Sequence, residues 1–184
     1  MNSLNMVFKS KAGFQMIKEE LIYAMCSHIT STERIRIFSL LTKRLNDKKI
    51  NLYSGDRLDI PGLNNKGPVD YYNAMPYVFK TSKINLNISL KCISSGIPLR
   101  VVDVLGCGGF LLSNYQPEVV EYLEPGKEVA IYSSIEEAVN LVDYYLRHEE
   151  ERVRIAKAGY EKIKKEFTYR DRLDKIFSIS GVSF

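Results

Sequence analysis

A chain of 184 residues with 45% apolar and 26% charged residues has the size and composition of one globular domain with a short extension. The formal net charge of +4 suits the binding of phosphates but lacks the dense basic stripe of a nucleic-acid-binding protein, so we expect no nucleic-acid partner. The three cysteines and two histidines indicate neither a disulfide framework nor a metal site. The lack of a long apolar run or signal-peptide pattern predicts a cytoplasmic protein without a membrane span.

The first 48 residues read as a helical extension. Apolar residues recur with the helical period between positions 14 and 25. A second helix is expected to begin at Thr30, which has the spacing of a capping box with Glu33, and to run to about Leu45.

The following residues alternate between strand and helix patterns. Strands are predicted at 50–53, 69–71, 83–88, 110–112 and 128–132, with a loop at 56–66. Helices are predicted at 76–80, 100–106, 117–122, 134–146, 149–167 and 168–177, two of them opened by the cap pairs Ser134–Glu137 and Thr168–Asp171. This order predicts an α/β fold for residues 49–184: a three-layer, Rossmann-like domain with a parallel sheet covered on both faces.

The segment from Ser94 to Asp103 carries the clearest chemical signal. Ser94, Ser95 and Gly96 form a small-residue loop before a helix, an arrangement whose backbone N–H groups bind anions. Arg100 lies in the first helical turn, where the helix dipole gives a cation no benefit, so an anionic ligand explains it well. Asp103 follows on the same face and is suited to accept bonds from hydroxyl groups; the alternative is that it pairs with Arg100.

Other candidates have an equally plain structural explanation. Gly55 follows the first strand, where it either makes a turn or lets a phosphate approach. Gly108 and Gly109 end a helix or contact the ligand. Asn85 and Asn87 share one side of their strand, and they either meet the ligand or bond a neighbouring loop.

Several ordered stretches resemble the CgeB-like (spore protein) glycosyltransferases, a branch of the GT-B group-1 glycosyltransferases. The matching pieces are SKINLN (82–87), SGIPLRVVDVLGCGGFLLS (95–113), YYLRHEEERVRIAKAG (144–159) and FTYRDR (167–172), with weaker similarity at LYSG (52–55). The resemblance covers about 100 residues and lies in the C-terminal, donor-binding half of the GT-B fold.

The resemblance implies that the domain binds a nucleoside-diphosphate sugar as substrate, with neither a bound metal nor a cofactor. Asp103 falls at the second of two donor-facing glutamates of the family, and Ser95 falls at the first, where it departs from the pattern. Arg100 fits the place of the diphosphate-binding cation, which makes Arg100 and Asp103 the catalytic candidates. The donor-binding candidates are Gly55, Asn85, Asn87, Ser94, Ser95, Gly96, Arg100, Asp103, Gly108 and Gly109.

A complete enzyme of this kind also has an acceptor-binding domain, and the 48 residues before the first strand are too few to form one. We therefore expect a partner chain with an acceptor domain, or a homo-oligomer, to complete the cleft, and little transferase activity from the chain alone. The alternative function is a catalytically inactive module that binds a nucleotide or a regulatory partner. A flavodoxin-like signalling domain fits less well, because no acidic cluster follows the strands at 50–53 and 84–88.

Overall fold

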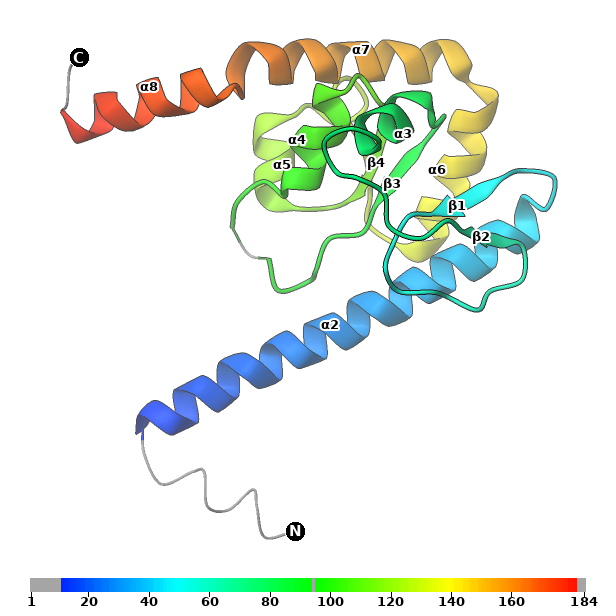
Figure 1. Cartoon of the computed structure of the whole chain (residues 1–184), viewed down its shortest axis with the longest axis horizontal. Coiled ribbons are helices and arrows are strands. Elements are labelled where there is room, and N and C mark those ends of the chain that lie inside the picture. The colour runs from blue at the N-terminus through cyan, green and yellow to red at the C-terminus, as the bar shows by residue number, and fades with distance from the viewer. Residues whose placement is uncertain (1–10, 94, 182–184) are drawn as a thin grey trace, which may run out of the picture.

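The computed structural model describes residues 11–93 and 95–181 (Figure 1). Its five strands are β1 (Ile50–Leu52), β2 (Leu63–Asn65), β3 (Asn85–Asn87), β4 (Leu111–Asn114) and β5 (Ala130–Tyr132). All strand pairs are parallel, and they form two separate sheets with the orders β1-β2 and β3-β4-β5.

Seven helices surround the strands in the described residues. They are α2 (Lys11–Arg44), α3 (Met75–Thr81), α4 (Leu99–Gly106), α5 (Pro117–Tyr122), α6 (Ile135–Arg147), α7 (Glu149–Glu166) and α8 (Tyr169–Ser180). Ser134 caps α6 by accepting a bond from the Glu137 N–H, and Thr168 and Asp171 form the predicted capping box of α8. The α/β class with parallel strands is thus confirmed.

Alternate side chains of the three-stranded sheet pack into two hydrophobic cores, one on each face of the sheet. On β4, Leu112 joins the core shared with α2 and α6, whereas Leu111 joins the core shared with α3, α4 and α5. Helix α7 contributes to both cores, through Ile155 and Ile163. The three-stranded sheet is therefore the middle layer of three, and β4 is buried along its whole length.

Two glycines set the spacing on the face covered by α3, α4 and α7. A side chain at Gly109 would lie 2.6 Å from the Phe79 carbonyl of α3, and one at Gly159 of α7 would lie 2.4 Å from the Glu128 carbonyl. Backbone meets backbone at both places, so only glycine fits.

The N-terminal prediction of two helices is wrong. Helix α2 is continuous, and Thr30 lies inside it with its hydroxyl donating to the Cys26 carbonyl at 2.8 Å instead of capping a helix. Ile37 and Leu41 of α2, and Leu45 just beyond its end, pack into the core, so the second half of α2 belongs to the packed body. The domain boundary at residues 48 and 49 stays a prediction.

The predicted strand at 69–71 is also wrong, because those residues lie in a turn-rich stretch before α3. A strand forms instead at β2, inside the segment expected to be loop. Asn65 fixes it locally, since its side chain both accepts from the Leu58 N–H and donates to the Leu58 carbonyl. None of the described helices combines the length and the apolar composition that a membrane crossing requires.

Candidate functional site

The candidate site lies at the carboxyl ends of the parallel strands, where α/β sheets bind ligands. The stretch that leaves β3 crosses this edge and enters α4 at Leu99. Lys91 stands near its beginning and Arg100 just beyond its end, so two cations bracket it.

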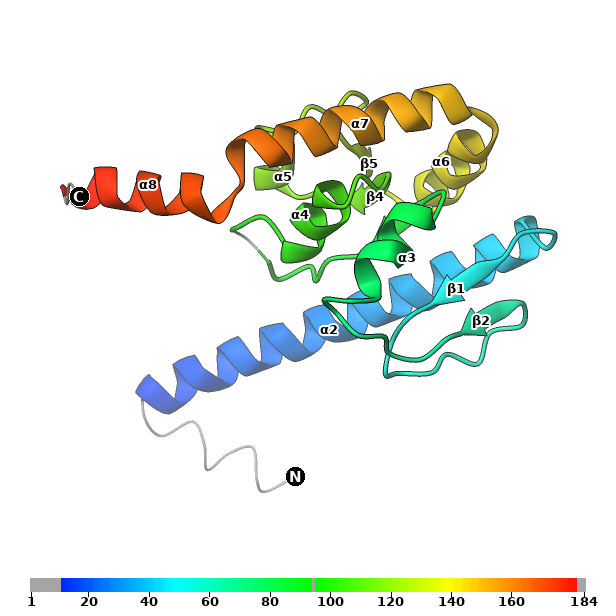
Figure 2. The ribbon, with the colours of Figure 1, turned by 45° about the horizontal axis from the view of Figure 1, so that its top comes forward.

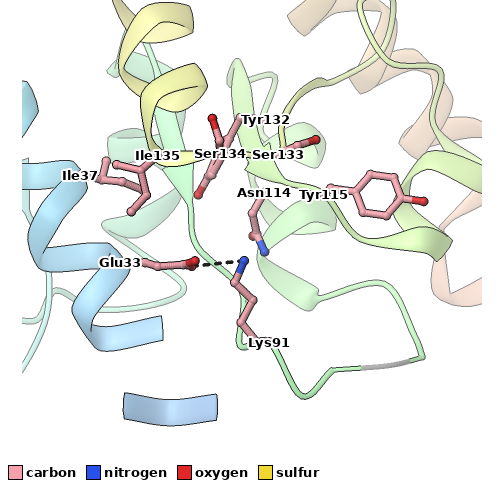
Figure 3. A pocket seen from close by; sticks show the side chains of 9 residues that line it. All are labelled: Glu33, Ile37, Lys91, Asn114, Tyr115, Tyr132, Ser133, Ser134 and Ile135. Atoms are coloured by element: carbon pink, nitrogen blue, oxygen red, sulfur yellow. Dashed lines mark ion pairs between the residues drawn. The ribbon is translucent and has the colours of Figure 1, made fainter. Parts of the chain in front are cut away.

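A small pocket opens beside β4 and β5 at this edge (Figure 3). Its volume of about 190 Å³ lies below the roughly 300–1,000 Å³ typical of small-molecule sites. The Lys91 ammonium and the Glu33 carboxylate of α2 form an ion pair of 3.3 Å across it. The lining residues are Glu33, Ile37, Lys91, Asn114, Tyr115, Tyr132, Ser133, Ser134 and Ile135.

A buried polar network supports the floor of this pocket. The Asn87 amide donates to the hydroxyl oxygens of Ser89 and Ser113, at 2.9 and 3.0 Å. The Asn114 side chain accepts from the Ser89 N–H at 2.8 Å, and the Tyr132 hydroxyl donates to the Asn87 carbonyl at 3.2 Å. Burial raises the pKa of Tyr132, so its phenol stays neutral and remains a donor.

The first turn of α4 presents Arg100 to solvent. Among the described residues Arg100 forms no ion pair, with Asp103 or with any other acid; its guanidinium lies over the Phe79 ring at 5.2 Å from the centroid. Asp103 instead accepts a hydrogen bond from the Tyr71 hydroxyl. This bond raises the pKa of Tyr71 to about 12, because the carboxylate stabilises the neutral phenol.

The small-residue loop before α4 is less open than the sequence suggests. Gly96 adopts the left-handed conformation, with φ +87°, and its N–H donates to the Glu118 carboxylate at 2.6 Å. An anionic ligand would therefore have to displace Glu118 from this amide. Ser95 is exposed, and Ser94 lies outside the described residues.

The remaining predicted residues have structural partners or open surroundings. The Asn85 amide donates to the carbonyls of Phe79 and Phe110, at 2.9 and 3.1 Å, so Asn85, like Asn87, bonds within the fold. Gly108 ends α4 with φ +74°, and Gly109 makes the close contact with α3. Gly55 is exposed after β1, away from any close neighbour.

Glu33, Tyr71, Lys91 and Glu118 were not among the residues predicted from the sequence. Tyr71 and Glu118 meet their partners across 32 and 22 residues of chain, and local patterns carry no signal for such distant pairs. Lys91 lies in the stretch that leaves β3 after Asn87, so its place near the ligand edge was the one accessible clue. In the described ranges, no three His, Cys, Asp or Glu side chains gather in a way that could hold a metal ion.

The architecture is that of GT-B glycosyltransferase domains. The structure of TarM superposes with a TM-score of 0.63 and 12% identity, covering 79% of this chain but only 31% of TarM. The C-terminal domain of the group 1 glycosyl transferase LpcC from Francisella tularensis gives a TM-score of 0.54 and 11% identity, covering 76% of this chain and 80% of that domain. These likenesses show the fold.

The family follows from the sequence match. A family model described as glycosyl transferase-like matches residues 34–178, which is most of the chain, so the chain belongs to that family. A search of curated proteins found no match.

Proposed function

We propose that this chain is the donor-binding domain of a glycosyltransferase and binds a nucleoside-diphosphate sugar at the carboxyl ends of β3, β4 and β5. The observation that carries the proposal is Arg100: an exposed guanidinium in the first turn of α4, without an ion-pair partner among the described residues, at the ligand edge of a glycosyl transferase-like domain.

The charge distribution supports a diphosphate at the start of α4. A guanidinium binds phosphate oxygens in a bidentate manner and keeps its charge at any working pH. In a transfer reaction, this fixed charge would stabilise the negative charge that develops on the departing nucleoside diphosphate. The Phe79 ring beneath Arg100 gives the guanidinium a favourable cation–π contact.

The neighbouring side chains suit the hydroxyl-rich parts of a donor. Asp103 accepts from the Tyr71 hydroxyl and keeps acceptor capacity for a ribose or sugar hydroxyl. The pocket beside β4 and β5 is too small for a whole nucleotide sugar, so it would hold one portion of the donor.

Thermal unfolding with candidate donors tests the proposal. At ten times Kd a ligand that binds only the folded chain stabilises it by about 1.4 kcal/mol, which raises Tm by roughly 3–5 °C for a chain of this size. We expect UDP or GDP, or one of their sugars, to give such a shift. Arg100→Ala should abolish the shift, whereas Arg154→Ala, at an exposed position on α7, should keep it. An equal shift in both variants would contradict the assignment.

A second candidate function is a binding module without catalysis. The bond between Gly96 and Glu118 favours it, because a carboxylate already occupies the amide that a diphosphate would need. A sugar-transfer assay on the chain combined with an acceptor-domain partner separates the two functions: turnover supports the transferase, and ligand binding without turnover supports the module.

A further inference from the structure

The two sheets leave one strand position empty. In the common doubly wound order 3-2-1-4-5-6, the chain lays strands outwards from the centre, first in one direction and then in the other. Strands β2 and β1 match positions 3 and 2, and β3, β4 and β5 match positions 4, 5 and 6. Position 1, between β1 and β3, has no strand in the described residues.

The strands that flank this position are incompletely covered. β4 is buried throughout, whereas Ile50 and Leu52 of β1 and Leu86 of β3 are only partly buried. Ile50 and Leu86 nonetheless pack against the same core, beside the second half of α2. In a parallel strand, alternate residues turn their N–H and C=O groups to opposite neighbours. In the part of the chain that the structure describes, β3 pairs with β4 on one side only, and no strand pairs with its other edge.

The first half of α2 has the composition of such a strand. This half projects away from the body of the molecule in both views (Figure 1, Figure 2). Five large apolar side chains on it are 45–59% exposed, and they are Leu21, Ile22, Tyr23, Met25 and Ile29. A helix that is apolar around its circumference is normally buried, and a strand buried on both faces has a near-continuous apolar sequence.

The residues that follow supply the start of a helix. Thr30 and Glu33 have capping-box spacing. In the continuous helix, the Thr30 hydroxyl instead donates a hydrogen bond to the Cys26 carbonyl. A strand at 21–28, a turn, a helix from about residue 32 to Arg44 and then β1 form a βαβ unit with a crossover of ordinary length. A helical crossover of this kind sets the new strand parallel to β1, with the usual right-handed connection.

We propose that α2 has a second conformation, in which residues 21–28 leave the helix and insert as a parallel strand between β1 and β3. The insertion joins the two sheets into one sheet of six strands and buries four of the five exposed apolar side chains, Leu21, Ile22, Tyr23 and Met25. It also starts α2 at the carboxyl edge of the sheet, with Glu33 of the pocket wall in the first turn. This second conformation is independent of donor binding.

Distance measurements between spin labels test the insertion in the full chain. With the three native cysteines replaced by alanine, labels go at Glu20→Cys and Lys43→Cys, both at exposed positions. A continuous helix separates the two by about 35 Å. The inserted strand runs back along α2, at a spacing of about 10 Å, so we expect a population below about 20 Å. Labels at Glu150→Cys and Glu161→Cys of α7 should show one distance of about 16 Å in either conformation.

A matched pair of charge substitutions assigns the short distance to the strand. Ile22 and Ile35 lie on the same helix with exposed fractions of 45% and 44%. Ile22→Glu should remove the short-distance population, because a central strand buries both faces. Ile35→Glu should leave it unchanged. A single long distance, a short distance that survives Ile22→Glu, or a short distance that appears only in a dimer would each overturn the proposal.

Discussion

Gly109 stands where α3 comes so close to the start of β4 that a methyl group has no room. Gly109→Ala would place its Cβ 2.6 Å from the Phe79 carbonyl and 2.8 Å from the Asn85 amide. Both neighbours are fixed, one by the backbone and the other by two hydrogen bonds. We expect a loss of about 1–3 kcal/mol in the free energy of unfolding, measured by urea denaturation.

Gly55→Ala is the matched control for this loss. The same methyl group at Gly55 meets open space, and the backbone there is not left-handed. The free energy of unfolding should stay within about 0.5 kcal/mol of the parent value or rise slightly. A similar loss in both variants would show that the contact with Phe79 does not limit position 109.

Tyr71 gives the site a signature at high pH. Its hydrogen bond to Asp103 raises the pKa of Tyr71 to about 12, so the phenol ionises later in the folded chain than in the unfolded chain. The stabilising contribution of this bond is therefore complete below about pH 10 and is lost as the pH rises through 12. Asp103→Asn should lower the pKa of Tyr71. The tyrosinate absorbance titration of Asp103→Asn, taken relative to the same titration of Tyr71→Phe, measures the change.

The sequence predicted the positions of the candidate residues better than it predicted their contact partners. The positions of Arg100 and Asp103 on the first turns of one helix followed from local pattern, and the structure places both there. Their partners, Phe79 and Tyr71, come from segments brought near by tertiary packing. The same limit applies to Gly96, whose partner Glu118 belongs to the next helix of the chain.

At the scale of elements, the junction between α6 and α7 depends on a buried arginine. Arg152 donates to the Tyr145 carbonyl at 2.7 Å and lies 3.4 Å from the exposed Glu149 carboxylate. The bond supplies a partner for a carbonyl near the end of α6, which no further helical turn satisfies.

Arg152→Met keeps most of the side-chain volume but leaves that carbonyl without its donor. We expect a loss of about 1–3 kcal/mol in the free energy of unfolding, seen as a fall in Tm of roughly 2–4 °C for each kcal/mol. Arg154→Met changes an exposed arginine on the same helix and should leave Tm nearly unchanged. Equal Tm values for the two variants would show that Arg152 does not stabilise this junction.

Elements with a strong periodic or capping signal were predicted well, and those shaped by distant contacts were not. Helices α6, α7 and α8 have caps or long amphipathic faces, and their predicted bounds agree with the structure to within a few residues. The three-residue β2 depends on pairing with β1 and on Asn65, which local sequence does not reveal. Thr30 shows the opposite failure, because a valid cap signal lies inside a continuous helix.

At the scale of the whole molecule, the bond between Gly96 and Glu118 would compete with the donor binding proposed above. On the proposed function, a diphosphate would have to displace the Glu118 carboxylate, or lie beside it and be repelled. Glu118→Gln removes the charge and keeps a weaker acceptor for the amide. We expect nucleoside diphosphates to bind several-fold more tightly to this variant in isothermal titration calorimetry.

Glu121→Gln provides the comparison, since it removes an equal charge from the same helix, one turn further on. An affinity gain of the same size in both variants would mean that overall charge, and not the Gly96 amide, controls binding. A weaker affinity in Glu118→Gln would show that the carboxylate assists the ligand.

The glycine contacts at 109 and 159 divide the molecule into a stiff side and a compliant side. On the side of α3, α4 and α7, the backbone of α3 contacts Gly109, and Gly159 of α7 contacts the Glu128 carbonyl. Neither α3 nor α7 can therefore move closer to its neighbour. On the opposite side, α2 and α6 meet the sheet through side chains, which change rotamer at little cost. If the proposed donor reshapes this domain, we expect α2 or α6 to move more readily than α3, and a reporter attached to α2 to respond more strongly than one attached to α3.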